Sequence, residues 1–229
     1  MIKHLFKLIW NKKKENFLLI TEILISFMVM FAVLTLLVYY YQNYRQPIGL
    51  KYENIWMVDL GQSSQSMPKD SISIAHQNLK NALGTMSKIK GVSFNSSNGP
   101  FTNSMMSTML KYRHNGVQTD IYTTDEDNAD VLGIEILKGR WFNAQDRTAL
   151  HQSVILNKDA AEKLTGTADA VGKILDLDEK KIKIIGVTAN FKDKGDFKAA
   201  TPGMFVQIDT GAVANINNVL LKVSPDADA

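Results

Sequence analysis

The chain has 229 residues, no cysteine, and 26 basic against 23 acidic residues, which gives a formal charge of +3. Without cysteine it can form no disulfide and carry no cysteine-linked lipid, so a folded domain of this size must rely on its hydrophobic core. The excess positive charge lies before residue 42, where five lysines face Glu15 and Glu22, whereas the rest of the chain is neutral. This distribution indicates membrane topology and argues against nucleic-acid binding.

Residues 1–16 are predicted to form a cytoplasmic, basic amphipathic segment. One helical face of the sequence IKHLFKLIW carries the apolar residues Ile2, Leu5, Phe6 and Ile9. A helix of this kind lies on the membrane surface with its apolar face among the lipids. The alternative is a frayed basic terminus.

Residues 17–40 form an unbroken apolar run, FLLITEILISFMVMFAVLTLLVYY. As a helix this run extends roughly 36 Å, enough to cross a hydrocarbon core of about 30 Å. The lysines before it and the tyrosines after it are typical of a span with a cytoplasmic N-terminus, so residues 41–229 are predicted to be periplasmic or extracellular. A cleaved signal peptide would have a shorter apolar region followed by small residues.

Glu22 is the only charged residue in the run, and simple anchoring does not require it. It lies about 7.5 Å along the helix from Phe17, inside the apolar boundary. Two interpretations stay open: the carboxylate faces other membrane helices, or it reaches the lipid headgroups.

The chain after the span begins with a predicted β-α-β unit. Residues 54–60, NIWMVDL, have the composition of a short strand. Ser66 and Pro68 mark the start of a helix with apolar residues at helical spacing, and this helix is expected to stop near Gly91. A strand over 92–95 completes the unit.

The following residues are predicted to alternate short strands and short helices. Asn115-Gly116 between two extended runs predicts a hairpin of residues 109–114 and 117–124. A second hairpin is predicted for 173–177 and 181–187, with its turn at 178–180. Short helices are expected over 127–132 and 158–164, and further strands over 153–157, 204–208 and 219–223. The predicted fold class is therefore mixed α+β.

No motif in the chain predicts catalysis, a cofactor or a metal ion. Segment 166–174, GTADAVGKI, resembles a phosphate-binding loop, but five residues separate its glycines and Ile174 stands where Ser or Thr is needed. The four histidines are too far apart for a zinc site, and no Gly-x-Ser-x-Gly motif occurs. We therefore expect no enzyme activity.

The most specific signal is an ordered series of short motifs. It comprises VLGIEILKGRWF at 131–142, SVILNKDAAEKLTG at 153–166, AVGKILDL at 170–177 and KIKIIGVTANFK at 181–192. In this order and spacing the series resembles the periplasmic core domain of the MacB and FtsX type of ABC transporter permease. Structural roles explain its residues, because glycines permit turns and aromatic side chains fill a core. The residues concerned are Gly133, Gly139, Arg140, Phe142, Asn157, Gly172 and Gly186.

The resemblance implies an exported domain of two subdomains, a porter-like β-α-β part with an inserted strand-rich part. It also implies a permease subunit of the bacterial inner membrane whose movement is driven by a cytoplasmic ABC ATPase subunit, for export, lipoprotein release or mechanotransmission. The assembly would be a homodimer or a permease heterodimer.

Two further expectations follow from the resemblance. A periplasmic adaptor would dock on the loop of residues 96–108 or on that of residues 193–202. Family permeases have three more helices after this domain, so the chain is expected to be a partial one. The alternative function, from another class, is the sensor ectodomain of a membrane receptor.

Overall fold

The computed structural model describes residues 13–61, 68–100, 102, 104–177, 180–209 and 216–227. The chain divides into two compact units, Met1–Gln46 and Pro47–Ala229. The predicted amphipathic segment falls mainly on residues 1–12, which lie outside the described part.

The described part of the first unit is one long helix, α2 (Lys13–Arg45). Its segment Phe17–Arg45 reaches a mean hydropathy of 2.6 and is long and apolar enough to cross a membrane. Two hydroxyl groups in this segment are satisfied within the helix, because Thr21 and Thr35 each donate to the carbonyl oxygen four residues earlier. The helix runs five residues past the predicted end at residue 40, since Pro47 is the first residue that disfavours it.

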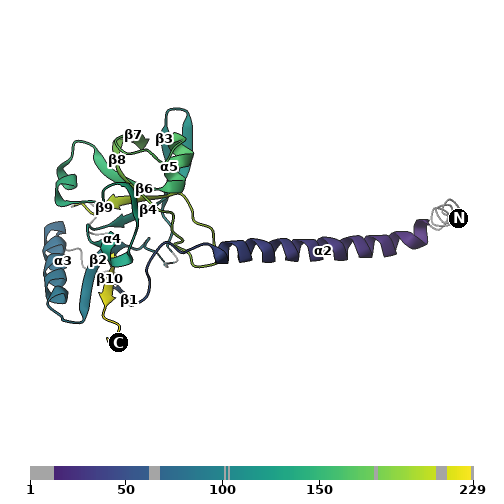
Figure 1. Ribbon diagram of the computed structural model, residues 1–229, viewed down its shortest axis with the longest axis horizontal. Helices are drawn as coiled ribbons and strands as arrows, with labels where there is room; N and C mark the ends of the chain where they lie inside the picture. Colours follow the sequence, from purple (N-terminus) through teal and green to yellow (C-terminus); the bar gives the residue numbers. More distant parts are fainter. Residues whose placement is uncertain are drawn as a thin grey trace. The chain divides into compact units, whose positions relative to one another are not determined.

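Ten strands in the described part of the second unit form one mixed sheet (Figure 1). The strands are β1 (Ile55–Asp59), β2 (Ile89–Ser96), β3 (Ser107–Tyr112), β4 (Asn115–Thr124), β5 (Ile136–Gly139), β6 (Gln152–Asn157), β7 (Ile174–Leu177), β8 (Lys180–Thr188), β9 (Gly203–Gln207) and β10 (Ile216–Val223). The helices are α3 (Lys69–Gly84), α4 (Asn128–Leu132), the 3-10 helix η1 (Ala144–Thr148) and α5 (Lys158–Thr165). The predicted α+β fold class is confirmed.

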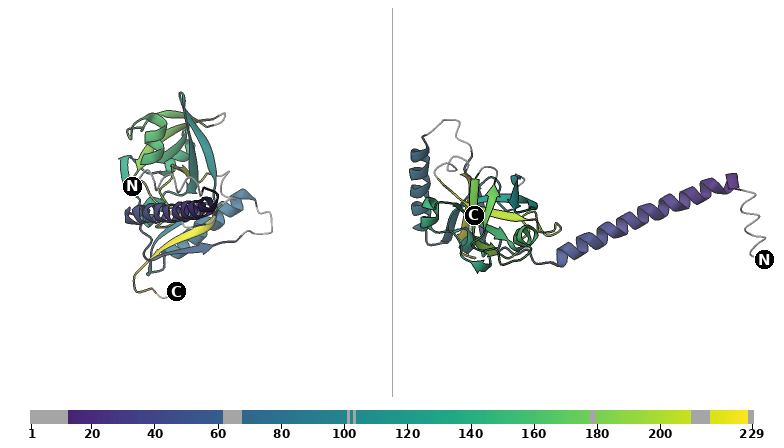
Figure 2. Two further views of the ribbon diagram at one scale, coloured as in Figure 1. Left: turned by 90° about the vertical axis from the view of Figure 1, so that its right-hand side faces the viewer. Right: turned by 90° about the horizontal axis from the view of Figure 1, so that it is seen from above.

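The sheet has two parts that meet at one residue pair. Its order is β1-β10-β2-β4-β3-β7-β8-β6-β9, with β5 paired to β8 and a further pairing of β4 with β9. The predicted β-α-β unit is present, but β10 lies between β1 and β2 and is antiparallel to both. Between β2 and β4 the register contains the single pair Asn95 and Thr124. Helix α3 lies along one side of the β1-β10-β2 part in Figure 1 and in the right-hand view of Figure 2.

Each part of the sheet has its own hydrophobic core. Under α3, Phe94 and Val219 of the sheet meet Leu79 and Leu83 of the helix. Under α5, the buried face of the helix meets strands β3, β6, β7 and β8. A third cluster is aromatic, with ring centroids 5.0 to 5.4 Å apart among Tyr122, Trp141, Phe142, Phe191 and Phe205. The two helix-covered cores lie on two parts of one sheet within a single compact unit, and the division into two subdomains stays a prediction.

Helix α3 is shorter than the sequence predicts. It ends at Gly84 rather than near Gly91, and β2 already begins at Ile89. Ile89 pairs with Val223 of β10. Residues just before Gly91, which the helical spacing assigns to the helix, therefore belong to strand β2. Met86, which the spacing places on the apolar helical face, is 53% exposed.

The first predicted hairpin forms, but its turn is not at Asn115-Gly116. Tyr112 pairs with Asn115, so the turn consists of Arg113 and His114, and Arg113 has a φ of +56°. The register is set by the core, because Leu110 is fully buried and pairs with Val117 on the same face. In the second hairpin Leu177 pairs with Lys180, so Lys180 belongs to β8 rather than to the turn.

Candidate functional site

Two of the motif glycines hold strands β5 and β8 together. Gly139 pairs with Gly186 in the antiparallel register. A Cβ atom on Gly139 would stand 2.2 Å from the carbonyl oxygen of Ile185, and one on Gly186 would stand 2.3 Å from that of Arg140. Any side chain at either position would collide with backbone, so both glycines are needed for this close approach.

The two other motif glycines lie at turns with positive φ. Gly133 has a φ of +60° and ends helix α4, where a Cβ atom would stand 2.7 Å from Cδ of Lys51. Gly172 has a φ of +85°, and a Cβ atom there would meet no heavy atom within 4 Å. The N–H of Gly172 donates to the carbonyl oxygen of Ile184. Gly172 therefore serves backbone conformation alone.

Arg140 forms a bidentate ion pair with Asp146 of η1. Its Nη1 and Nη2 atoms lie 2.6 Å and 2.7 Å from the two carboxylate oxygens. The same carboxylate accepts hydrogen bonds from the Ser153 hydroxyl and the Asn143 N–H. The Arg140 guanidinium holds the pKa of Asp146 below its ordinary value, because the bonds favour the charged form. Phe142, next to this pair, is buried against Trp141.

Asn157 joins β6, α5 and β9. Its Oδ1 atom caps α5 by accepting from the N–H of Ala160 and also accepts from the N–H of Gly203. Its Nδ2 atom donates to the carbonyl oxygen of Thr201 at 2.6 Å. All of these contacts are structural, and the side chain is fully buried.

The structure brings together the two loops that the sequence proposes for adaptor docking. Lys194, in the loop of residues 193–202, donates to the carbonyl oxygens of Thr102 and Ser104, both at 3.0 Å. Beside this bridge the side chains of Met105 and Phe197 are 71% and 56% exposed. We call this region the two-loop surface, defined by Thr102, Ser104, Met105, Met106, Lys194 and Phe197.

A buried polar network, which the sequence analysis missed, fastens α3 to the end of β4. The Asp125 carboxylate accepts hydrogen bonds from the Ser93 hydroxyl, the Phe94 N–H and Lys80 Nζ of α3. Burial raises the pKa of Asp125. Burial alone would lower the pKa of Lys80, but Asp125 and Asp127 outweigh it and raise the pKa. No local pattern predicts these contacts, because their partners are 31 to 45 residues apart in the chain.

The network borders a small cavity of about 130 Å³ between α3, β2 and the end of β9. His76 lies in its wall with its ring 5.0 Å from that of Phe94, and burial lowers the pKa of this histidine. Within the described ranges, no group of three His, Asp or Glu side chains could hold a metal ion. Glu22 is exposed on the surface of α2, and no described ion pair includes it.

These features define a class of protein in which an α+β domain follows a helix that can span a membrane. The motif residues of the domain have structural roles, and the described residues contain no recognised catalytic cluster. The chain belongs to the MacB-like periplasmic core domain family, whose pattern matches residues 17–229. It is thus the periplasmic-type domain of a MacB-type ABC permease, which favours the permease class over the sensor alternative.

Curated relatives support the assignment. The macrolide export ATP-binding/permease protein MacB of Pasteurella multocida is 33% identical over 79 residues, which are 34% of this chain and 12% of that protein. The protein of the same name from Neisseria gonorrhoeae is 25% identical over 125 residues, covering 52% of this chain and 19% of the relative. The chain therefore matches less than a fifth of either relative's length.

A solved structure supports the fold. The periplasmic region of MacB from Actinobacillus actinomycetemcomitans superposes with a TM-score of 0.53 at 19% identity, over 80% of this chain and 78% of that one. At this identity the likeness concerns the fold alone. It agrees with the mixed sheet and helices described above.

Proposed function

We propose that the chain belongs to a permease subunit that transmits the ATP-driven closure of a separate cytoplasmic ATPase subunit to its exported domain. The observation that carries this proposal is the family match over residues 17–229 together with a helix, α2, that is long enough to span the membrane. The movement would serve export, lipoprotein release or mechanotransmission. The subunit itself would carry out no catalysis.

The lysines before the span support an orientation with the N-terminus in the cytoplasm and residues 41–229 outside it. In the bacterial inner membrane the subunit would act as a homodimer or permease heterodimer, with α2 in contact with lipid. Glu22 would then face other membrane helices or the headgroups, since a charge within the apolar region needs a polar partner.

Affinity purification tests the central claim. The protein, tagged at its N-terminus, is purified from its own membranes in mild detergent. We expect an ABC ATPase subunit to co-purify and the complex to hydrolyse ATP. A Glu22→Gln variant distinguishes the two interpretations of Glu22: reduced recovery of partner subunits indicates helix contacts, and unchanged recovery indicates headgroups. Absence of any ATPase subunit from the wild-type preparation would refute the permease role.

The two-loop surface is the proposed docking site for a periplasmic adaptor. Lys194 holds both loops in one place, and the exposed apolar side chain of Met105 adapts readily to a partner surface. A photo-crosslinking residue at position 105 should capture an exported partner protein, whereas one at position 86, another exposed methionine, should not. Equal crosslinking at both positions, or none, would dismiss this surface as the docking site.

A further inference from the structure

A groove of about 520 Å³ lies on the strand-rich part of the second unit, away from the residues used so far for docking. Three segments line it: the connection from η1 to β6, the start of β8, and the end of β9. Its volume is in the range of pockets that hold small molecules. The wall residues used below are Arg147, Ala149, Leu150, Lys180, Lys181 and Ile208.

The floor of the groove is held by hydrogen bonds that do not involve the lysines of the walls. Asp146 lies in it, 8% exposed, with its carboxylate fully engaged by Arg140, Asn143 and Ser153. Its negative charge is therefore neutralised by a side chain, Arg140, that is not part of the groove lining. A preformed floor lowers the cost of ordering a site on binding.

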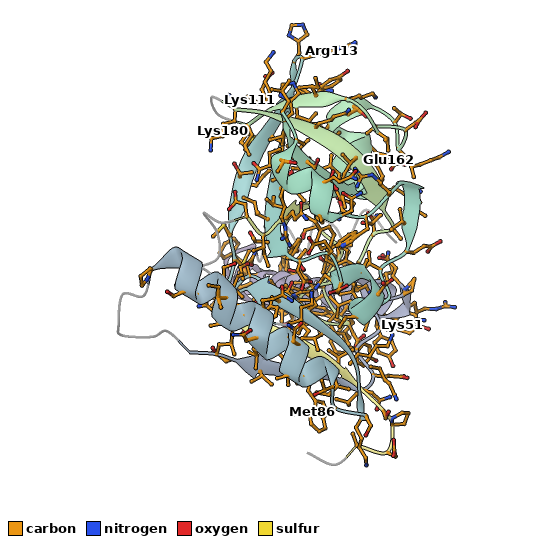
Figure 3. The ribbon with its side chains drawn as sticks, turned by 90° about the vertical axis from the view of Figure 1, so that its left-hand side faces the viewer. Lys51, Met86, Lys111, Arg113, Glu162 and Lys180 are labelled. Carbon is orange, nitrogen blue, oxygen red and sulfur yellow. The ribbon has the colours of Figure 1, made fainter. Side chains whose placement is uncertain are left out.

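The walls carry three cationic side chains, Arg147, Lys180 and Lys181, together with the carboxylate of Asp209. Lys180 and Lys181 are exposed, and neither has an ion pair with a described residue. Arg147 donates one Nη2 hydrogen bond to Glu126 and keeps further N–H groups for another acceptor. Figure 3 shows Lys111 and Arg113 at the same end of the unit as Lys180, although neither lines the groove. The exported residues are neutral as a whole, so this clustering is not a consequence of composition.

The rim of the groove also carries an apolar side chain that contributes nothing to the core. Leu150 is 93% exposed, and Ala149 and Ile208 lie in the same lining. A single exposed leucine is common on protein surfaces. Here it offers apolar area beside cationic side chains. Cationic groups beside such an apolar rim complement a molecule with an anionic head and an apolar part.

We propose that this groove binds a phosphate-bearing amphiphile. The phosphate accepts strong, charge-assisted hydrogen bonds from Lys181 and Arg147. Lys180 precedes Lys181 in β8 and adds positive charge beside them. The apolar part of the ligand covers Leu150 and Ala149. This inference does not depend on the proposed transport role, because it concerns a surface of the folded domain only.

The test measures binding of dihexanoyl phosphatidic acid, which is soluble in water, to the full chain in phosphatidylcholine nanodiscs by calorimetry, with empty nanodiscs subtracted. We expect saturable binding that Lys180→Gln with Lys181→Gln weakens about tenfold, as loss of charge-assisted bonds does. A matched control, Lys51→Gln with Lys138→Gln, removes two exposed lysines elsewhere and should change nothing. Circular dichroism checks that all variants fold.

Two further arms identify the ligand class. Leu150→Ser should weaken binding of the phosphatidic acid, and dihexanoyl phosphatidylcholine should bind much more weakly than the phosphatidic acid to the wild type. Equal binding of inorganic phosphate and of the phosphatidic acid would refute the amphiphile in favour of a free-anion site. Loss of binding in the control double variant, or no binding to the wild type, would refute the groove itself.

Discussion

A methyl group added at Gly139 tests how tightly β5 and β8 are packed. Its Cβ atom would stand 2.2 Å from the carbonyl oxygen of Ile185, and the φ of +72° would be retained. The left-handed conformation costs alanine about 1–2 kcal/mol, and overpacking against fixed atoms costs about 1–3 kcal/mol. Alanine regains about 0.4–1 kcal/mol by restricting the unfolded chain. We therefore expect Gly139→Ala to lower the free energy of unfolding by about 3 kcal/mol.

Two matched variants separate the terms of this sum. Gly172 has a φ of +85° and open space around its Cβ position, so Gly172→Ala carries only the conformational cost, about 1 kcal/mol. Gly186 does not have a positive φ, but its Cβ atom would stand 2.3 Å from the Arg140 carbonyl oxygen. Gly186→Ala therefore carries the contact cost of about 2 kcal/mol less the gain of about 0.7 kcal/mol from the unfolded chain, which leaves about 1.3 kcal/mol.

Urea unfolding of the detergent-solubilised chain measures all three variants. Tryptophan fluorescence reports the transition, because Trp141 is buried in the aromatic cluster. The midpoint should fall in the order Gly172→Ala, Gly186→Ala, Gly139→Ala, with the dependence on urea unchanged. If Gly139→Ala destabilises no more than Gly172→Ala, the backbone contact with Ile185 is not a constraint and the reasoning fails.

Three other substitutions have defined outcomes. Asn157→Ala leaves the N–H groups of a helix end and of β9 without their acceptor, and thermal unfolding should show a loss of about 2–3 kcal/mol. Arg140 depresses the pKa of Asp146, so the pair stabilises the fold fully above the pKa of an unfolded aspartate, about 4, and less as the pH falls below it. Urea titration should therefore show that the difference in unfolding free energy between wild type and Asp146→Asn decreases below that pH. Lys194→Met should speed hydrogen exchange near residue 104 while global stability changes by less than about 1 kcal/mol, and unchanged exchange would contradict the bridging role.

The sequence is informative where a signal is local. The apolar run predicts the long helix, alternating residues predict most strands, and the ordered motifs predict the family. The helix predicted from the apolar run is too short at its C-terminal end. The polar residues after Tyr41 continue the helix, although they are not apolar enough to mark a membrane span. Strand β5 escapes prediction for a similar reason: its four residues are all exposed and show no alternation.

The remaining features depend on contacts between distant residues. The turn at Arg113 and His114 displaces the expected Asn-Gly turn, because burial of Leu110 fixes the register and a turn preference is weaker than a core position. Lys194 meets residues about 90 positions away, and Lys80 meets Asp125 across 45. Periodicity carries no information on such pairs, so neither the two-loop surface nor the network under α3 could be assembled from the sequence.

The position of β10 between β1 and β2 has a consequence for the order of folding. Ser96 of β2 pairs with Ile216 of β10, so completing this part of the sheet closes a loop of about 120 residues. The strands from β3 to β9 lie within that loop and can pair with one another first. As the chain is synthesised, the strand-rich part is therefore expected to become compact early, while β1, β2 and α3 stay accessible to proteases and chaperones until β10 pairs with them.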